Sequence, residues 1–330
     1  NTTGTRNIAI GNTAYDASDT ENDNLAIGHA AMSVNTAGGI QNIAIGNYAL
    51  DGLTSGDSNV AIGYNAMSAT VTGGQNTAVG NSAMEVLTTG ATNTAVGYVS
   101  LDALTTGSNN TAVGWSSLGA TTTADDNTAV GKNSMLINTE GYSNTAIGIY
   151  SLRQNTTGNN NVAVGQSALL NNTTASENVA VGYNSSYHNT TGIRNISIGA
   201  YANENSDTEN DNLAIGFEAM HTDNGGGTHN VAIGNYAGDA ITSADYNVLV
   251  GFDAGGAINS GGSNVAIGHD TLKTNSTGIN STAVGRLALQ ANSTGQENVA
   301  VGMQSLQANT TGNQNTAVGN YALFTNTTAT

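Results

Sequence analysis

Short runs of alternating polar and apolar residues return along this chain at a nearly constant interval. The pentapeptide Asn-(Thr/Val/Ile/Leu)-Ala-(Val/Ile)-Gly, with single departures at Ser197, Leu249 and Ser281, starts at residues 7, 24, 42, 59, 76, 93, 110, 127, 144, 161, 178, 195, 212, 230, 247, 264, 281, 298 and 315. Sixteen of the 18 intervals are 17 residues long, and the other two are 18. Apolar residues at helical spacing are missing. The pattern predicts an all-β parallel β-solenoid (β-roll) of about 19 coils.

Each predicted coil has room for two short strands. The first lies at the pentapeptide and the second around the Ala/Ser-Leu/Met pair that follows it, with a turn at either end. Like residues then stack on like residues, about 4.8 Å apart. The repeat core is represented by Ile62, Gly63, Ala129, Val130, Gly131, Asn161, Ala163, Val164 and Gly165.

Gly and Asn mark fixed places in the repeat. The pentapeptide Gly, present in all 19 copies, indicates a positive φ or a close approach of the neighbouring chain. The leading Asn, present in 18 copies, is expected to form a ladder of side-chain hydrogen bonds along the stack. A second Gly, three residues before the pentapeptide, occurs in 14 coils and fits the opposite turn. This turn also tolerates a side chain, because five coils have another residue there: Glu21, Ala124, Ala175, Glu209 and Ala244.

The two faces of the first strand differ in size, since side chains alternate across a strand. The fourth pentapeptide position is always Val or Ile, and the third is Ala in 17 copies. Three residues past the Gly, every coil has Ala or Ser except for Thr271. Small residues opposite small residues predict a thin roll whose interior holds only methyl groups.

The Val/Ile column then needs burial elsewhere, because an exposed stripe of this length exceeds the apolar patches of soluble monomers. Cyclic packing of identical chains would bury it, so we predict a homo-oligomer, in particular a homotrimer. The alternative is a fatter monomeric solenoid with Val and Ile inside and Ala outside. The second position is expected to be less deeply buried than the fourth, because it is Thr in seven coils: Thr77, Thr94, Thr111, Thr128, Thr145, Thr282 and Thr316.

A longer repeat overlies the short one. Residues 18–28 recur identically at 206–216, an offset of 188 residues. This offset equals ten coils of 17 and one of 18, so a block of 11 coils is duplicated and residues 1–63 are similar to 189–251. We interpret residues 1–330 as a single continuous repeat array, an excerpt of a longer fibre.

The amino-acid composition limits the kinds of partner that the chain is expected to bind. Only 9% of the residues are charged, against about 25% in ordinary globular domains. The formal net charge is -17, and the chain has only six Lys and Arg residues. These are too few to neutralise the phosphates of a nucleic acid, so nucleic acid is not an expected partner. No apolar run of about 18 residues is present, and no membrane insertion of this segment is expected. The absence of Cys excludes disulfides and thiolate metal sites.

Copies such as Asn59-Val60-Ala61-Ile62-Gly63 and Asn264-Val265-Ala266-Ile267-Gly268 resemble the head repeats of trimeric autotransporter adhesins of the YadA type. The resemblance covers the whole chain, and similar repeats occur in phage tail fibres and other surface fibres. It implies a left-handed, trimeric β-roll with Ala inside each roll and Val/Ile packed toward the threefold axis. The family's repeats are shorter, and the extra residues of this chain fall in its Asn-Thr-Thr-Gly turn.

Candidate chemistry is sparse. The five histidines share no common repeat position, which is typical of solvated turns: His29, His188, His221, His229 and His269. We expect no catalytic, cofactor-binding or metal-binding residues and no enzymatic activity. The acidic turn Asp16, Asp19, Glu21 and Asp23, which recurs as Asp207, Glu209 and Asp211, offers oxygen ligands for Ca²⁺. Because no EF-hand or calcium β-roll motif is present, we interpret it as a solvated acidic loop.

Two further surface features have open alternatives. The glycosylation patterns beginning at Asn155, Asn189 and Asn309 are either acceptor sites or a by-product of Asn/Thr-rich turns. Aromatic residues one or two places after the pentapeptide Gly either stack on sugars or pack over the neighbouring coil: Tyr64, Tyr98, Trp115, Tyr183, Phe217, Phe252 and Tyr321.

These observations predict a structural or adhesive fibre shaft, extracellular and located on a cell or virion surface. Its variable polar turns would attach to a host-surface glycan or protein through many weak contacts. One alternative is an ice- or lattice-binding solenoid, suggested by the five consecutive coils with Thr from Thr77 to Thr145. Another is a phage tail-fibre shaft that recognises host glycans. A glycan-cleaving β-helix is disfavoured, since no acidic pair marks a catalytic groove.

Overall fold

The computed structural model describes residues 3–17, 20–35, 38–222 and 225–329, and their only regular secondary structure is short β-strands. The chain forms two compact units, Asn1–Asn161 and Val162–Thr330. The first unit contains β1 (Ile8–Ile10), β2 (Leu25–Ile27), β3 (Ile43–Ile45), β4 (Val60–Ile62), β5 (Thr77–Val79), β6 (Thr94–Val96), β7 (Thr111–Val113), β8 (Thr128–Val130) and β9 (Thr145–Ile147). The second contains β10 (Val162–Val164), β11 (Val179–Val181), β12 (Ile196–Ile198), β13 (Leu213–Ile215), β14 (Val231–Ile233), β15 (Val248–Val250), β16 (Val265–Ile267), β17 (Thr282–Val284), β18 (Val299–Val301) and β19 (Thr316–Val318).

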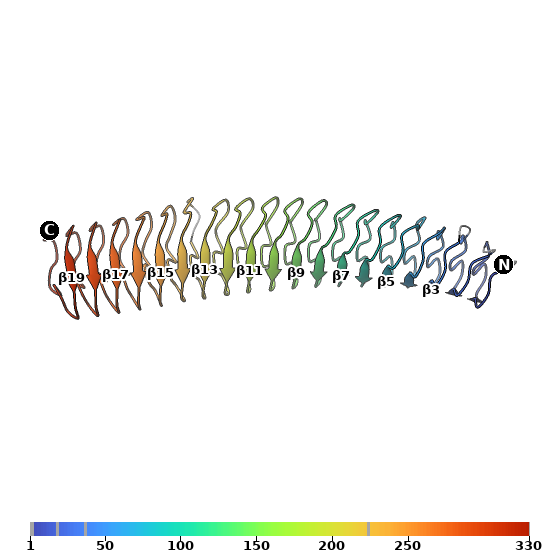
Figure 1. Cartoon of the computed structure of the whole chain (residues 1–330), viewed down its shortest axis with the longest axis horizontal. Coiled ribbons are helices and arrows are strands. Elements are labelled where there is room, and N and C mark those ends of the chain that lie inside the picture. Colours follow the sequence, from blue (N-terminus) through green and yellow to red (C-terminus); the bar gives the residue numbers. More distant parts are fainter. Residues whose placement is uncertain (1–2, 18–19, 36–37, 223–224, 330) are drawn as a thin grey trace. The chain divides into compact units, whose positions relative to one another are not determined.

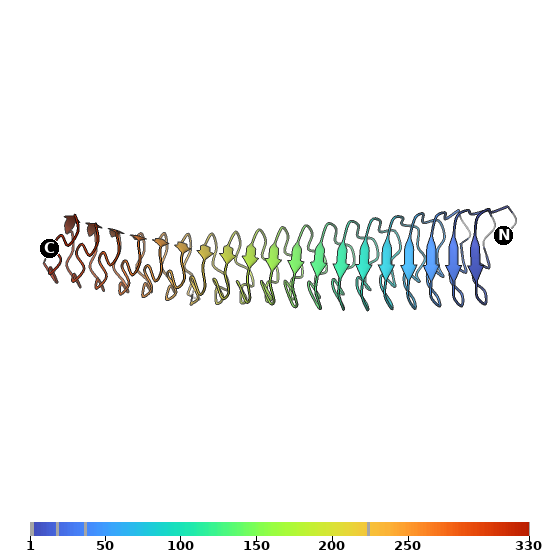
Figure 2. The ribbon, with the colours of Figure 1, turned by 90° about the horizontal axis from the view of Figure 1, so that it is seen from below.

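Within each unit, every strand pairs in parallel with the strand one repeat later (Figures 1 and 2). The register joins like positions, so that Ala163 faces Ala180 and Val164 faces Val181. The two 18-residue intervals leave this register unchanged, as in the pairing of Ala26 with Ala44. The predicted parallel β-solenoid with a 17-residue period is therefore confirmed. That the two units form a single continuous array stays a prediction.

The middle residue of each strand points into the coil. Ala78, Ala163 and Ala266 have no exposed surface, and the same holds for almost every other strand Ala. Residues on either side of it are half-buried or exposed in all strands. Alanine is thus inside and Val/Ile outside, as the thin-roll interpretation predicted, and the alternative with Val and Ile inside is wrong for this chain.

The prediction of a second strand is wrong for the described residues. The segment after the pentapeptide Gly is a series of turns, and its second and fourth residues have left-handed backbones, for example Tyr48 (φ 61°) and Leu50 (φ 51°). Each such conformation is unfavourable for a residue with a Cβ. Cross-coil hydrogen bonds offset the strain: the Tyr48 N–H donates to His29 O (2.9 Å) and the Leu50 N–H to Ala66 O (3.0 Å).

The prediction of an interior filled only by methyl groups is also wrong. The turn conformation directs the Leu/Met column inward, and Met32, Leu50, Met84 and Leu169 are fully buried. Three residues later, a further inward position holds side chains such as Leu53. The roll is therefore thin at the strand but filled by long side chains from the opposite turn.

Leu249, the one large residue in the column of strand alanines, is accommodated by two glycines. Gly238 and Gly255 occupy the Leu/Met positions of the β14 and β15 coils. A Cβ on either would lie 2.8 Å from a methyl group of Leu249. Leu249 therefore fills the space that Leu or Met fills in other coils, and the interior volume is conserved although the residues differ.

The pentapeptide Gly meets both predicted requirements. Its φ lies between 124° and 145° in every coil from Gly11 to Gly319. Within each unit, a Cβ at these positions would lie 2.2 to 2.8 Å from the carbonyl oxygen of the Gly in the next coil, except at the terminal Gly319. A side chain at this position would separate adjacent coils.

The leading Asn forms the predicted ladder inside the coil. The Asn76 backbone N–H donates to Asn59 Oδ1 (2.9 Å), and Asn76 Nδ2 donates to the carbonyl of Gly90 in the next coil (2.9 Å). These Asn side chains are almost completely buried. Ser281 continues the ladder with a longer contact, because its hydroxyl accepts the Asn298 N–H at 3.3 Å. Each Asn amide thereby ties three successive coils together.

Glu21 and Glu209, which replace the second Gly, are buried and adjoin the two 18-residue coils. Glu209 Oε2 accepts hydrogen bonds from Ser206 Oγ (3.0 Å) and Thr208 N (2.8 Å), and Oε1 accepts from Gly226 N (3.0 Å). Glu21 Oε1 similarly accepts from Gly38 N (3.2 Å). The interpretation of this acidic turn as fully solvated is wrong for these two carboxylates, which satisfy backbone donors of the longer coil.

The volume exchange at Leu249 gives a first prediction. Leu249→Ala should leave a cavity and destabilise the second unit by about 2 to 5 kcal/mol. Gly255→Leu alone should destabilise it by overpacking. The double variant restores the common Ala-and-Leu pattern, so we expect it to recover much of this loss.

Urea unfolding of the three variants, followed by circular dichroism, measures these differences. Additive losses in the double variant would show that the two positions do not share one interior space.

Candidate functional site

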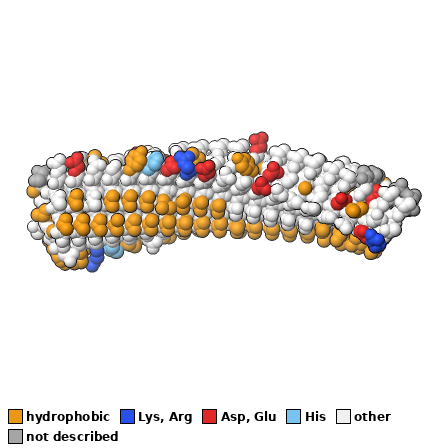
Figure 3. Space-filling view, in the orientation of Figure 1, with side chains coloured by type: hydrophobic (Ala, Val, Ile, Leu, Met, Phe, Trp, Pro, Cys, Tyr) orange, Lys and Arg blue, Asp and Glu red, His pale blue; other side chains and the backbone are white. Residues whose placement is uncertain are grey.

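The second and fourth pentapeptide residues, which are the first and third residues of each strand, form a largely apolar surface that we call the outward face. Hydrophobic side chains form rows on this surface that run from coil to coil, across the strands (Figure 3). The fourth residue is Val or Ile throughout, and it keeps 37% to 41% of its surface exposed at Ile62, Val96, Ile147 and Ile267. The outward face is therefore built into every coil and is not covered within a single chain.

In the first unit, the outward face changes character from β5 to β9. The first residue of each of these five consecutive strands is Thr, and the pairing places the Thr side chains in one column from Thr77 to Thr145. All five are half-buried. The second pentapeptide residue was predicted to be less deeply buried than the fourth. Within one chain this difference is not present, because the second residue is half-buried in most strands and the fourth is half-buried or exposed.

A row of aromatic rings in the second unit lies directly after the strands. It comprises Tyr183, Tyr201, Phe217, Tyr236, Phe252 and His269, and we call it the aromatic edge. Its rings contact one another from coil to coil, with centroid distances of 5.2 to 5.9 Å. The first four contacts are edge-to-face and the last is stacked. The rings of this row thus contact the rings of the neighbouring coils, and stacking on sugars stays open for the exposed ones.

The rings predicted in the first unit behave differently. Tyr64 contacts Tyr48 edge-to-face at 5.9 Å and is half exposed. Trp115 lies under Lys132, whose Nζ is 4.2 Å from the ring centroid. Tyr98 is 55% exposed. The structure thus places Phe217 and Phe252 in one row and Tyr64, Tyr98 and Trp115 at similar positions of the other unit.

Charged side chains lie beside the aromatic edge. Glu204 pairs with His221 (Oε2–Nε2, 2.9 Å), and the ring of His221 is 6.5 Å from that of Tyr201. Lys273 bridges Asp253 (2.6 Å) and Asp270 (3.1 Å). Carboxylates outnumber cations along this edge, so its field is negative.

Asp239 lies among these charges. Burial raises the pKa of its carboxyl to about 6, and repulsion by Asp253 and Glu218 adds to the effect. Its own backbone N–H and His221 act in the opposite direction. Ionisation of Asp239 is thus less favourable than that of a solvated carboxyl.

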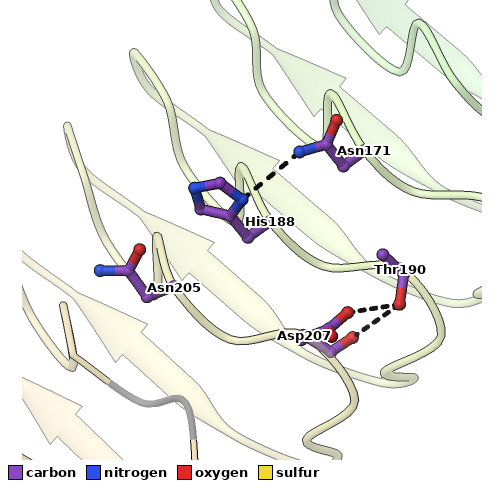
Figure 4. Close-up of a pocket in the computed structure, with 5 residues that line it drawn as sticks. All are labelled: Asn171, His188, Thr190, Asn205 and Asp207. Carbon is purple, nitrogen blue, oxygen red and sulfur yellow. Dashed lines mark hydrogen bonds between the residues drawn. The ribbon is translucent and has the colours of Figure 1, made fainter.

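A polar hollow of about 410 Å³ lies between two columns of turn side chains in the second unit. Its lining residues are Asn171, His188, Thr190, Asn205 and Asp207 (Figure 4). The amide nitrogen of Asn171 is 3.5 Å from Nδ1 of His188, and the Thr190 hydroxyl donates to the carboxylate of Asp207. These groups could hydrogen-bond a small polar ligand.

The remaining sequence-predicted groups are dispersed. His29 and His269 each contact an aromatic ring, and His229 stacks on Tyr246 at 5.0 Å. In the acidic turn and its repeat, Asp23 and Asp211 pair with Arg6 and Arg194, whereas Asp19 lies outside the described residues. No group of three His, Asp or Glu side chains in the described ranges is arranged to hold a metal ion.

A second column of buried Asn was missed by sequence reasoning. Asn155 Nδ2 donates to Asn138 Oδ1 (2.7 Å) and to the carbonyl of Gly158 (3.0 Å). Asn189 and Asn309 make equivalent bonds and are at most 1% exposed. The three glycosylation patterns therefore present inward-facing amides, which could accept a glycan only by leaving the interior. The feature of the sequence that could have revealed this buried column is the recurrence of Asn three residues after the Leu/Met position.

The fold defines this chain as a parallel β-solenoid with an apolar outward face. No known family model matches the sequence, and no curated protein matches it. In the part of the chain that the structure describes, there is no apolar helix of membrane-spanning length. The likeness to trimeric autotransporter head repeats therefore stays a resemblance in sequence pattern.

The environment of Asp239 gives a second prediction. Its raised pKa means that the folded chain binds this proton more tightly than the unfolded chain, so stability falls as the pH rises from about 4 through 6. Asp239→Asn removes the charge, and its melting temperature should exceed that of the wild type at about pH 7.5 but not at about pH 4.

Differential scanning calorimetry at the two pH values measures both differences, with Asp126→Asn as an exposed control. An equal shift at both pH values would contradict the electrostatic explanation.

Proposed function

We propose that this chain is the shaft of an extracellular structural or adhesive fibre, built from a homo-oligomer of left-handed β-rolls, with three copies as the expected number. The observation that supports it is the outward face. An outward Val/Ile column on every coil, widened by a second apolar residue in 12 of the 19 coils, is costly to leave in water. Parallel packing of identical chains around one axis would bury the column along its whole length.

The role of such a shaft is mechanical rather than catalytic. Each coil contributes the same backbone ladder and the same buried Asn amide, so resistance to bending and unfolding accumulates with coil number. Exposed turn residues vary from coil to coil, which suits display to a cell or virion surface. Attachment to a host glycan or protein would then use many weak contacts in parallel.

Assembly through the outward face gives a third prediction. Val164→Asp places a charge on this face, and Val164→Asp with Val181→Asp places charges on two paired strands. Burying unpaired carboxylates is unfavourable, so the single variant should dissociate at a higher protein concentration than the wild type, and the double variant at a still higher one. Light scattering measures the molar mass, which should fall to 33.1 kDa for the double variant.

Gln166→Asp is the matched control, because Gln166 is exposed and lies two residues from Val164. Circular dichroism confirms that the variants keep their β-structure. A wild-type chain that remains monomeric at every concentration would rule out the proposed assembly.

A second candidate function, binding to ice or another crystal lattice, is favoured by the outward Thr column from Thr77 to Thr145. Regularly spaced hydroxyls can match a lattice. We expect no such activity, because Thr is replaced by Val, Ile or Leu in most other strands and no strand has Thr at both outward positions. A thermal hysteresis measurement near the freezing point should therefore show none, and inhibited ice growth would favour this candidate instead.

A further inference from the structure

From Tyr183 to Phe252 the aromatic edge has a two-coil period, which ends at the exposed ring of His269 on the coil next to Phe252. Tyr183, Phe217 and Phe252 directly follow the pentapeptide Gly on the coils of β11, β13 and β15. Tyr201 and Tyr236 stand one residue further along on the coils between them. The first three rings are 37% to 45% exposed, whereas the other two are half-buried. Exposed rings thus recur every second coil, at a spacing of roughly 9.5 Å.

The half-buried tyrosines hold the exposed rings in place. Tyr201 lies between Tyr183 (5.2 Å) and Phe217 (5.9 Å), and Tyr236 lies between Phe217 (5.6 Å) and Phe252 (5.7 Å). The interplanar angles are 78° to 89°. Phe217 is therefore held edge-to-face on both sides, Phe252 between Tyr236 and the stacked His269, and Tyr183 on one side. A ring held in this way loses less freedom on binding, which lowers the entropic cost of recognition.

The charges beside the rings restrict the ligand. Glu204, Glu218, Asp253 and Asp270 lie on the same turn segments as the rings, and Lys273 is bound to two of these acids. Anionic ligands and the same edge of a second copy would be repelled. An uncharged ligand rich in hydroxyl groups would instead donate strong hydrogen bonds to the carboxylates.

We propose that the aromatic edge binds an extended, uncharged, β-1,4-linked glycan that runs along the coils, with one disaccharide for every two coils. The disaccharide of such a chain has about the length of this two-coil period. The apolar C–H face of alternate sugar rings would pack on Tyr183, Phe217 and Phe252, and the hydroxyls would point to the flanking carboxylates. This inference rests on the adhesive part of the proposed function and specifies its ligand class.

Isothermal titration of the full chain with cellohexaose tests the proposal. Maltohexaose has the same composition but an α linkage and a coiled shape, and hexagalacturonate is anionic. We expect binding of cellohexaose alone. Phe217→Ser and Phe252→Ser should each weaken it about tenfold, the loss expected for one ring contact.

Tyr246→Ser is the matched control, because Tyr246 is 60% exposed and its ring contact is with His229, outside the aromatic edge. It should leave the affinity unchanged. Absence of cellohexaose binding, equal binding of maltohexaose, or an equal loss in Tyr246→Ser would each overturn the proposal. Light scattering on the same samples separates the two claims: an oligomer that binds no glycan refutes only the glycan site, and a monomer that binds it refutes only the assembly.

Discussion

A strand of three residues can direct only one side chain into its coil, and this constraint governs the rest of the molecule. Alanine takes the inward place in nearly every strand, so the coil is thin there and the two outward places are left to β-branched residues. Close stacking of the coils then requires Gly immediately after the strand, because a Cβ would collide with the next coil. The apolar outward face is thus a direct consequence of how each coil is filled.

The interior is maintained by volume rather than by residue identity. Leu249 is balanced by Gly238 and Gly255, and the inward position three residues after Leu/Met alternates between apolar side chains such as Leu104 and runs of hydrogen-bonded Asn such as Asn155. An Asn column is tolerated inside the coil because its amide nitrogens donate to the preceding Asn and to a turn carbonyl, as at Asn155 and Asn309. Polar residues are therefore part of the core of this fold. A polar residue in the sequence does not by itself indicate a position on the surface.

The sequence pattern was sufficient to predict the strand at each pentapeptide, its register, the conformation of Gly165 and its equivalents, the Asn ladder and the inward Ala, but the second strand that it predicted in each coil is a series of turns. It could not predict the left-handed backbones at residues such as Leu50, since non-glycine residues rarely adopt them and periodicity does not report them. The inward Leu/Met column, the buried carboxylate of Glu209 and the buried Asn155 all follow from those turns. At the candidate site, the sequence was sufficient to identify the aromatic positions that directly follow the pentapeptide Gly. The alternation of exposed and half-buried rings could not be predicted, because it depends on how the rings of neighbouring coils pack.

We propose that the outward face serves self-association and that the aromatic edge serves ligand binding. The most direct test of burial of the outward face between chains is the reactivity of single cysteines, because the chain has none of its own. Val164→Cys, with Gln166→Cys as an exposed reference, would be treated with a bulky maleimide under native conditions. The account predicts rapid labelling at position 166 and protection at position 164 until the assembly is dissolved by denaturant. Equally rapid labelling at both positions would contradict it.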